Sequence, residues 1–332
     1  MHQRLSRSNW PYCDSTYPDA FSGEKDSCGV GFIASVEGKQ NHWVLSQALR
    51  GLSCMEHRGG CGGDGDSGDG AGILCEIPWS YLRKVWETAK ECEPQSSGIG
   101  MIFMPKDSKN REIARKICEQ EAESVGLTSK GWRNVPVQEE VLGKLARENE
   151  PFITQWIVNT KDKDINLEAL LFRLRQRISN RANIELKEDK LGLYICSLSS
   201  KTIVYKGMVR SEILAPYYVD LNDDRFEVSY AVYHRRFSTN TLPKWPLAQP
   251  MRLLGHNGEI NTLLGNINWA KATETDISSV WKDNSNDLKP IVNNLFSDSA
   301  NLDLNLELLV RSGRPITDSL LTLIPEAFRG QP

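Results

Sequence analysis

The segment EKDSCGVGFIA, residues 24–34, changes abruptly from charged and polar residues to an apolar run. Residues 1–27 are polar and lack any periodicity, whereas residues 28–34 have the continuous apolar character of a strand buried on both faces. The boundary between these two parts falls immediately before Cys28. A cysteine in this place can be a packing residue, the start of a nucleotide-binding loop, or a nucleophile that becomes an amino terminus.

The composition is typical of a globular protein that acts on a small substrate. The 332 residues are 39% hydrophobic, which is enough for one large core or two smaller ones. Lys and Arg total 40 against 43 Asp and Glu, so the chain lacks the basic surface that binding to nucleic acid or to an anionic membrane requires. No apolar run is long enough to cross a bilayer, and the first residues lack the apolar core of a secretory signal.

The cysteines and glycines do not form a recognisable metal or nucleotide motif. Without an export signal, the eight cysteines are expected to be reduced thiols, and no C-x-x-C pair occurs. The loop GGCGGDGDSGDGAG, residues 59–72, resembles a calcium loop, but Gly68, Asp69 and Cys75 stand where an EF-hand requires Asp or Asn, Gly and Glu. The GVG of residues 29–31 lacks the third glycine of a dinucleotide fingerprint. We therefore expect a flexible turn at this loop and no metal site.

The apolar pattern predicts a chain of mixed strands and helices, without internal repeats. Strands are expected over residues 28–34, 73–79, 101–105, 151–158, 191–200, 201–207 and 226–237. Helices are expected over residues 44–55, 111–124, 167–182, 258–272 and 299–313.

Two polar motifs lie at the ends of predicted elements, where functional sites are often found. HRRFSTNT, residues 234–241, contains Arg236, whose planar guanidinium can bind a carboxylate through two parallel hydrogen bonds or simply form a surface ion pair. LLGHNGEINT, residues 253–262, contains Asn257 and Gly258. A side-chain amide and an exposed backbone N–H of this kind can stabilise an oxyanion, although HNG is also a common turn sequence.

Five motifs occur in a fixed order along the chain. They are CGVGFIA at 28–34, CMEHRGGCGGDGDSGDGAG at 54–72, HRRFSTNT at 234–241, HNGEINT at 256–262 and SDSANLD at 297–303. Taken together they resemble the class II glutamine amidotransferase region of the glutamate synthases, and most of all the ferredoxin-dependent ones. The similarity extends over nearly all of residues 28–332.

The resemblance implies both a fold and a domain organisation. The implied fold is the α+β fold of the N-terminal nucleophile hydrolases, a four-layer αββα sandwich of two antiparallel sheets. Residues 1–27 are implied to be a leader that is removed, and residues 28–332 to be an amidotransferase domain that is truncated at its C-terminal end. The family members are several times longer than this chain, so we expect it to be a fragment.

The same resemblance implies the catalytic residues. After removal of the leader, Cys28 would supply a thiol as nucleophile and its own α-amino group as base. An α-amino group has an ordinary pKa of about 7.7 to 8.0 and a cysteine thiol one of about 8.5, so neither is far from neutrality. The thiolate would attack the amide carbon of glutamine, with the oxyanion held by Asn257 Nδ2 and the Gly258 N–H.

Substrate-binding residues are implied in the same way. Arg236 would bind the α-carboxylate of glutamine and Asp298 its α-ammonium group. Arg58 matches an arginine near the family's site, with a purely structural role in orienting the 59–72 loop as the alternative. Residues 237–250 would close over the bound glutamine.

The resemblance also implies partners that lie outside these residues. Ammonia would pass to a missing synthase domain with a 2-oxoglutarate site, for which FMN and an iron–sulfur cluster are implied, with ferredoxin as electron donor. No cofactor is expected in this fragment, and the expected location is the cytoplasm, or the plastid stroma in a photosynthetic eukaryote. Two alternatives stay open: an N-terminal-nucleophile hydrolase for another amide, and a non-catalytic module in which Cys28 is never exposed.

Overall fold

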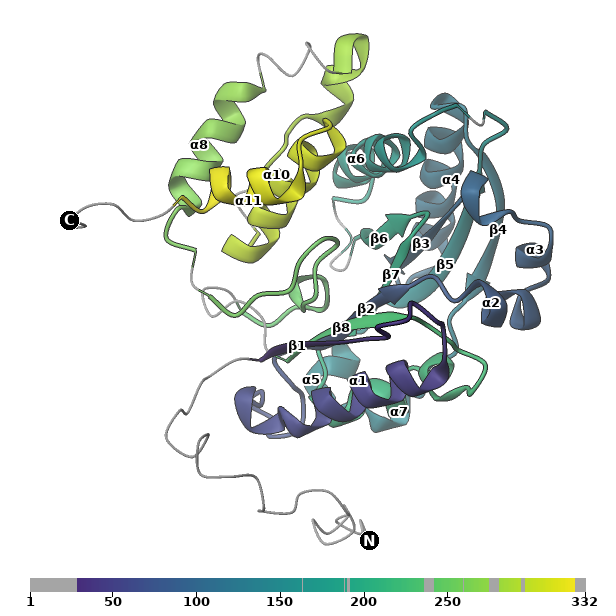
Figure 1. The fold of residues 1–332 in the computed structure, drawn as a ribbon, viewed down its shortest axis with the longest axis vertical. Helices are drawn as coiled ribbons and strands as arrows, with labels where there is room; N and C mark the ends of the chain where they lie inside the picture. The colour runs from purple at the N-terminus through teal and green to yellow at the C-terminus, as the bar shows by residue number, and fades with distance from the viewer. Residues whose placement is uncertain are drawn as a thin grey trace, which may run out of the picture.

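Two antiparallel sheets form the centre of the molecule (Figure 1). The computed structural model describes residues 29–162, 164–187, 189, 192–235, 242–258, 260–274, 281–293 and 296–325. Within these residues the first sheet has the order β1 (Val30–Ala34), β8 (Tyr230–Arg235), β2 (Ala71–Glu76), β7 (Thr202–Gly207). The second sheet has the order β4 (Thr128–Asn134), β5 (Phe152–Asn159), β3 (Ser97–Met104), β6 (Tyr194–Ser199).

Helices cover the outer faces of both sheets (Figure 1). Helix α1 (His42–Cys54) lies on the first sheet, and α4 (Ser108–Ser124) and α6 (Leu167–Glu185) lie on the second. Strand β3 shows how alternation builds these layers, because successive side chains point to opposite faces of a sheet. Its odd-numbered apolar residues belong to the core between the sheets, and its even-numbered ones pack against α4 and α6. The predicted αββα sandwich is confirmed.

Helix α1 illustrates how the sequence produces one of these layers. The side-chain oxygen of Asn41 accepts a hydrogen bond from the N–H of Val44 and caps the first turn. The apolar residues that follow recur at helical spacing and are buried toward the sheet. A Cβ on Gly51 would lie 2.6 Å from the hydroxyl oxygen of Tyr233, so the absence of a side chain lets α1 pack closely on β8.

The remaining helices are short, except for those near the C-terminal end. Helix α10 (Asp298–Arg311) is buried on all sides from its first residue to Leu308, and it lies beside α6, α8 (Leu263–Thr273) and α11 (Ile316–Leu323) (Figure 1). In the part of the chain that the structure describes, the other helices are α2 (Trp79–Val85), α3 (Glu87–Lys90), α5 (Lys144–Glu148), α7 (Leu214–Tyr217), η3 (Glu56–Arg58), η4 (Pro94–Ser96), η5 (Glu139–Val141), η6 (Ser211–Ile213), η7 (Val219–Asn222), η8 (Trp245–Leu247) and η9 (Lys282–Leu288).

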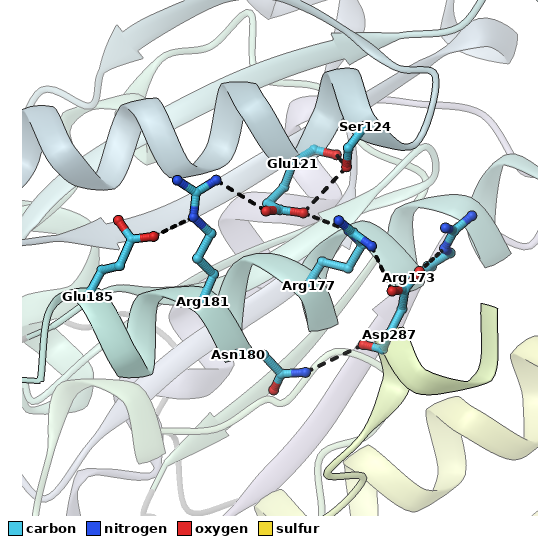
Figure 2. Close-up of polar contacts among 8 residues, drawn as sticks. All are labelled: Glu121, Ser124, Arg173, Arg177, Asn180, Arg181, Glu185 and Asp287. Atoms are coloured by element: carbon cyan, nitrogen blue, oxygen red, sulfur yellow. Dashed lines mark hydrogen bonds and ion pairs between the residues drawn. The ribbon is translucent and has the colours of Figure 1, made fainter. Parts of the chain in front are cut away.

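A ladder of charged side chains joins the C-terminal part of the chain to the sandwich (Figure 2). Arg177 of α6 stands between two carboxylates, with its Nε 2.6 Å from Glu121 of α4 and its NH1 2.6 Å from Asp287 of η9. Arg173 and Arg181, one turn of α6 away on either side, extend the ladder to Asp287 and Glu121 respectively. Helix α6 therefore connects α4, its neighbour on the second sheet, to η9, which precedes α10 in the chain.

Some element boundaries differ from the expectations. The strand expected over residues 226–237 begins only at Tyr230, because Phe226 closes a turn with Asp223 and packs against the rings of Tyr81 and Tyr205. The strand expected over 73–79 spans 71–76 instead, since α2 begins after Pro78.

The helix expected from Gly258 starts at Leu263. The side chain of Gln249 binds the N–H of His256, and that of Asp298 binds the N–H of Ile260. Strand β4 was not expected, since its polar sequence TSKGWRN has little apolar alternation. No helix in the described part of the chain is long and apolar enough to cross a membrane.

Candidate functional site

The ends of β1 and β8 lie together at one edge of the first sheet. Cys28 and Arg236 fall outside the described residues, but their neighbours Gly29 and Arg235 are described. The N–H of Arg235 donates to the carbonyl oxygen of Gly29 at 2.6 Å, and a Cβ on buried Gly29 would lie 2.1 Å from the carbonyl oxygen of Arg235. Only glycine fits at position 29. Cys28 adjoins Gly29 and Arg236 adjoins Arg235 in the sequence, so each candidate residue is next to one member of this bonded pair.

The loop that carries Asn257 and Gly258 lies against this edge. A Cβ on Gly29 would lie 3.5 Å from Oδ1 of Asn257, and Gly255 faces the side chains of Val30 and Val232. Asn257 is half-buried, whereas Gly258 is exposed and has open space around its Cα. The side chain of Asn257 therefore stands next to the residue that follows Cys28, and Gly258 is the next residue along the chain.

Asp298 joins the same site from the start of α10. Its carboxylate is buried, with Oδ1 accepting the N–H of Ser299 at 2.8 Å and Oδ2 accepting the N–H of Ile260 at 3.3 Å. The positive end of the helix dipole favours a negative charge in this first turn. Because Ile260 is three residues from Asn257, the structure brings the predicted oxyanion donors and the predicted ammonium ligand to one loop.

Arg58 is half-buried at the end of η3, on a segment that a different arginine holds in place. The fully buried Arg235 donates to Glu56 Oε1 at 3.2 Å and to the carbonyl oxygens of Gly60 and Gly70 at 3.3 Å each. A Cβ on Gly59 would lie 1.9 Å from the Cζ atom of Arg235. Arg235 therefore orients the start of the 59–72 loop, which is the structural role that the sequence leaves open for Arg58.

Three further residues of the site were missed by sequence reasoning. Arg235 and His234 lie on opposite faces of β8, and His234 contacts the carbonyl oxygen of His256 through Nε2 at 2.8 Å. Gln249 also binds the backbone of residue 256. The alternation of a strand predicts that neighbouring residues face opposite ways, but no local pattern marks Gln249.

Burial gives the histidine of the HNG motif an unusual environment. Loss of solvation lowers the pKa of His256, an effect that the nearby carboxylate of Asp298 partly opposes. Since its ordinary pKa is 6.5, the ring is neutral at pH 7.

The glycine-rich loop has a structural use for its acidic residues. Asp64 accepts hydrogen bonds from the N–H of Leu145 at 2.9 Å and from the hydroxyl of Ser67 at 2.6 Å, and these donors hold the pKa of its carboxyl far below the ordinary range. Among the described residues, no three His, Cys, Asp or Glu side chains are grouped as ligands of a metal ion. In this loop the Asp64 carboxylate anchors α5.

Comparison with known proteins gives a consistent result. The family model described as "Glutamine amidotransferases class-II" matches residues 28–332, so that the match begins at Cys28. The chain is 50% identical over 315 residues to ferredoxin-dependent glutamate synthase 2 of Synechocystis sp. and 50% identical over 316 residues to ferredoxin-dependent glutamate synthase of Pyropia yezoensis. It is 46% identical over 315 residues to ferredoxin-dependent glutamate synthase 1, chloroplastic/mitochondrial, of Arabidopsis thaliana.

These alignments include 93% of this chain but only 20%, 20% and 19% of the respective relatives. The chain thus spans about a fifth of the length of the curated relatives that it matches.

Proposed function

The chain belongs to the class II glutamine amidotransferases, and we propose that it hydrolyses glutamine to glutamate and ammonia as the amidotransferase part of a glutamate synthase. The observation that carries this proposal is that Asn257 lies beside Gly29 and that Ile260, three residues later, binds the carboxylate of Asp298. The similarity to ferredoxin-dependent glutamate synthases supports the use of the ammonia for glutamate formation from 2-oxoglutarate.

The nucleophile in this proposal is Cys28 after removal of residues 1–27, with residues 28–332 forming the amidotransferase domain. The start of the family match at residue 28 supports this boundary. The free α-amino group accepts the thiol proton, and the sulfur forms a bond to the carboxamide carbon of glutamine. The C–N bond then breaks, the proton passes to the departing ammonia, and a thioester remains. Water, deprotonated by the same amine, releases glutamate and restores the thiol.

Asn257 and Gly258 are the proposed oxyanion donors, through Nδ2 and the backbone N–H. The position of Asn257 beside Gly29 supports this role, because a donor has to lie within about 3 Å of the oxygen that becomes charged. Donors that are already oriented stabilise the tetrahedral intermediate without a cost of reorganisation at the moment of reaction.

Arg236, Asp298 and Arg58 are the proposed substrate-binding residues. An arginine for the α-carboxylate and an aspartate for the α-ammonium group would select free glutamine over a glutaminyl residue within a peptide. The buried carboxylate of Asp298 supports its part, since a charge interacts more strongly where water is excluded. The place of Arg58 next to the segment anchored by Arg235 is compatible with contact to the substrate.

We assign FMN, the iron–sulfur cluster and the contact with ferredoxin to the part of a glutamate synthase beyond these residues. The thiols of Cys75, Cys92, Cys118 and Cys196 are buried, and burial raises the pKa of each one. Buried thiols held in the protonated form and not grouped together do not fit a cluster site. By analogy with relatives named chloroplastic, we propose the plastid stroma as location in a photosynthetic eukaryote and the cytoplasm otherwise.

A glutamine analogue with a diazomethyl ketone in place of the carboxamide tests this proposal. The full chain is produced, its mass is measured, and ammonia and glutamate release are followed before and after treatment. We expect loss of residues 1–27, glutaminase activity, and an adduct that peptide mapping assigns to Cys28. The exposed thiols of Cys54 and Cys61 serve as internal controls and should stay unlabelled. An active preparation with an intact Ser27–Cys28 peptide bond would contradict the mechanism.

A further inference from the structure

The side chain of Gln249 binds the backbone of His256 in both directions. The N–H of His256 donates to Gln249 Oε1 at 3.0 Å, and Gln249 Nε2 donates to the carbonyl oxygen of His256 at 3.1 Å. A residue pair in an antiparallel ladder exchanges hydrogen bonds in the same way. Between these two residues the chain reverses direction, with the N–H of Met251 donating to the carbonyl oxygen of Leu254 at 2.8 Å.

Gln249 itself is fixed against the centre of the first sheet. It is 2% exposed, and its carbonyl oxygen lies 2.6 Å from the position that a Cβ on Gly72 would occupy. Because Gly72 has no side chain, the loop rests directly on strand β2. Nε2 of Gln249 also donates to the hydroxyl of Ser299, at 3.3 Å, next to Asp298. The carboxamide thus links the sheet, the loop and the start of α10.

A second donor reaches the same carbonyl group. Nε2 of His234 lies 2.8 Å from the carbonyl oxygen of His256, which can only accept, so this nitrogen carries the proton. His234 is 1% exposed on β8, where it pairs in register with Val30 of β1. The peptide unit immediately before Asn257 is therefore held from two sides by buried side chains.

We propose that Gln249 is a positioning residue that orients the peptide before Asn257 and thereby places the two oxyanion donors. This inference rests on the proposed function, in which Asn257 and Gly258 stabilise the tetrahedral intermediate. Interactions realised mainly in the transition state affect kcat more than KM. A displaced donor pair should therefore slow the reaction of bound glutamine and leave its binding nearly unchanged.

The variant Gln249→Leu removes the two hydrogen bonds to His256 and the one to Ser299 at a similar side-chain volume. We expect kcat for glutamine hydrolysis to fall by about 10- to 100-fold, because a misplacement of about 1 Å can have an effect of this size. KM for glutamine should change by less than about 3-fold, because the variant weakens binding of the transition state and leaves binding of the substrate nearly unchanged. Steady-state kinetics of ammonia release from the full chain, with residues 1–27 removed, give both values.

Gln155→Leu is the matched control. Gln155 is also a buried glutamine with both amide atoms bonded, since Arg133 NH1 donates to its Oε1 at 2.7 Å and its Nε2 donates to the hydroxyl of Tyr205 at 2.8 Å. It lies between the sheets, away from the loop at 249–258. Its substitution should lower the free energy of unfolding and leave kcat of the folded fraction unchanged.

The variant Gln249→Glu distinguishes a positioning role of residue 249 from a role in stability alone. In Gln249→Glu, the ionised carboxylate accepts the N–H of His256 but cannot donate to its carbonyl oxygen, whereas the protonated acid does both. Burial raises the pKa of such a carboxyl group. The ratio of kcat in Gln249→Glu to kcat in the unsubstituted protein should therefore rise between about pH 8 and about pH 6. The same ratio for Gln249→Leu should stay flat.

The titratable groups around position 249 are common to both proteins in each ratio. They are His234 on β8, His256 on the loop, Lys206 on β7 beside Gly72, and Asp298 on α10. Because the variant and the unsubstituted protein both contain these groups and the Cys28 α-amino group, the effect of these groups on kcat is removed when the ratio is taken.

Asn257→Ala distinguishes the failure of this inference from the failure of the proposed function. If Asn257→Ala keeps the kcat of the unsubstituted protein, the oxyanion assignment itself is lost. If Asn257→Ala is inactive while Gln249→Leu keeps its kcat, or raises only KM, Gln249 is not a positioning residue. Should Gln249→Leu fail to fold, the pH dependence of Gln249→Glu decides, and a flat ratio overturns the inference.

Discussion

In the proposed function, Asp298 is the described residue whose charge bears most directly on substrate selection. Its carboxylate is 5% exposed and receives hydrogen bonds from two backbone N–H groups in the loop and in the first turn of α10. These donors orient the carboxylate, and a carboxylate oxygen can accept more than one hydrogen bond. An ammonium group that reaches this carboxylate would form a desolvated ion pair, which is stronger than one at the surface.

Replacing Asp298 with asparagine keeps the shape of the side chain and removes the charge. A hydrogen bond to a charged group contributes about 1.5 to 3 kcal/mol, so KM for glutamine should rise by about 10- to 100-fold, with a smaller effect on kcat. Steady-state kinetics measure this change, and Asp318→Asn on the exposed face of α11 is the control.

We expect Arg236→Ala to raise KM for glutamine in the same manner as Asp298→Asn, while alkylation of Cys28 by iodoacetamide keeps its rate. An unchanged KM in both variants would favour a hydrolase for another amide.

At the scale of elements, α5 depends on a loop that lies far away in the sequence. The preceding residue, Gly143, offers no capping side chain, and the first N–H groups of α5 are instead accepted by two residues of the 59–72 loop. Asp64 accepts from Leu145, and the hydroxyl oxygen of Ser67 accepts from Ala146, each at 2.9 Å. Unsatisfied N–H groups at a helix start are costly, so the loop and the helix stabilise each other.

Asp64→Ala should destabilise the protein by about 1 kcal/mol at pH 7, the usual cost of losing a capping side chain. The folded state lowers the pKa of Asp64 below its ordinary 3.8, mainly through the N–H of Leu145. This contribution is therefore complete above pH 3.8 and is lost as the pH falls toward the folded-state pKa. Urea unfolding at several pH values should show a constant difference from the unsubstituted protein above about pH 4.5 and a smaller one below.

Asp66→Ala is the control for this prediction. Asp66 lies in the same loop, but its carboxylate is 61% exposed and contacts Arg210 only at 3.2 Å. We expect its substitution to change stability by less than about 0.5 kcal/mol. If both variants behave alike, the capping of α5 by Asp64 is not the source of the effect.

At the scale of the whole molecule, α10 is the element that connects the site to the rest of the fold. It carries Asp298 at its start, and the Asp303 carboxylate one turn further on accepts the N–H of Leu253 at 2.9 Å and lies 2.9 Å from Arg252 NH1. Near its end, Glu307 pairs with Arg175 of α6 at 2.6 Å, with both side chains at least 96% buried. Arg252, Leu253 and Ile260 are therefore attached to the sandwich through the buried polar side chains of this helix.

Glu307→Ala should destabilise the protein by about 3 to 5 kcal/mol, because it leaves the charge of Arg175 buried without its carboxylate. Burial and the nearby Arg252 lower the pKa of Arg175 to about 10, so the guanidinium is still charged at pH 7. Urea unfolding measures the loss. Glu185→Ala, which breaks an exposed pair with Arg181 at the end of α6, should cost less than about 1 kcal/mol.

A double variant completes this test. Arg175→Leu combined with Glu307→Leu removes both charges and should be more stable than Glu307→Ala alone, since the unpaired buried charge causes most of the loss. Equal stability of Glu307→Ala and Glu185→Ala would show that the buried pair does not hold α10 in place.

The main elements of the sandwich could be expected from local patterns. Strand β1 and helix α1 followed from an apolar run and from helical spacing, which depend only on residues close in the sequence. The polar strand β4 and the non-helical place of Ile260 could not be expected in this way, because partners in other elements determine them. The family could be predicted because five short motifs occur in a fixed order.

The sequence by itself determined the candidate residues, the family resemblance and, through its apolar pattern, most of the strands and helices of the sandwich. Only the tertiary structure decided which residues meet: that Asn257 lies beside Gly29, that Ile260 binds Asp298, and that Arg235 orients the segment of Arg58. The physical reason is that these contacts join segments of the chain that are far apart in sequence. Hydrogen bonds and close packing across such distances depend on how the layers stack, and no local periodicity records them.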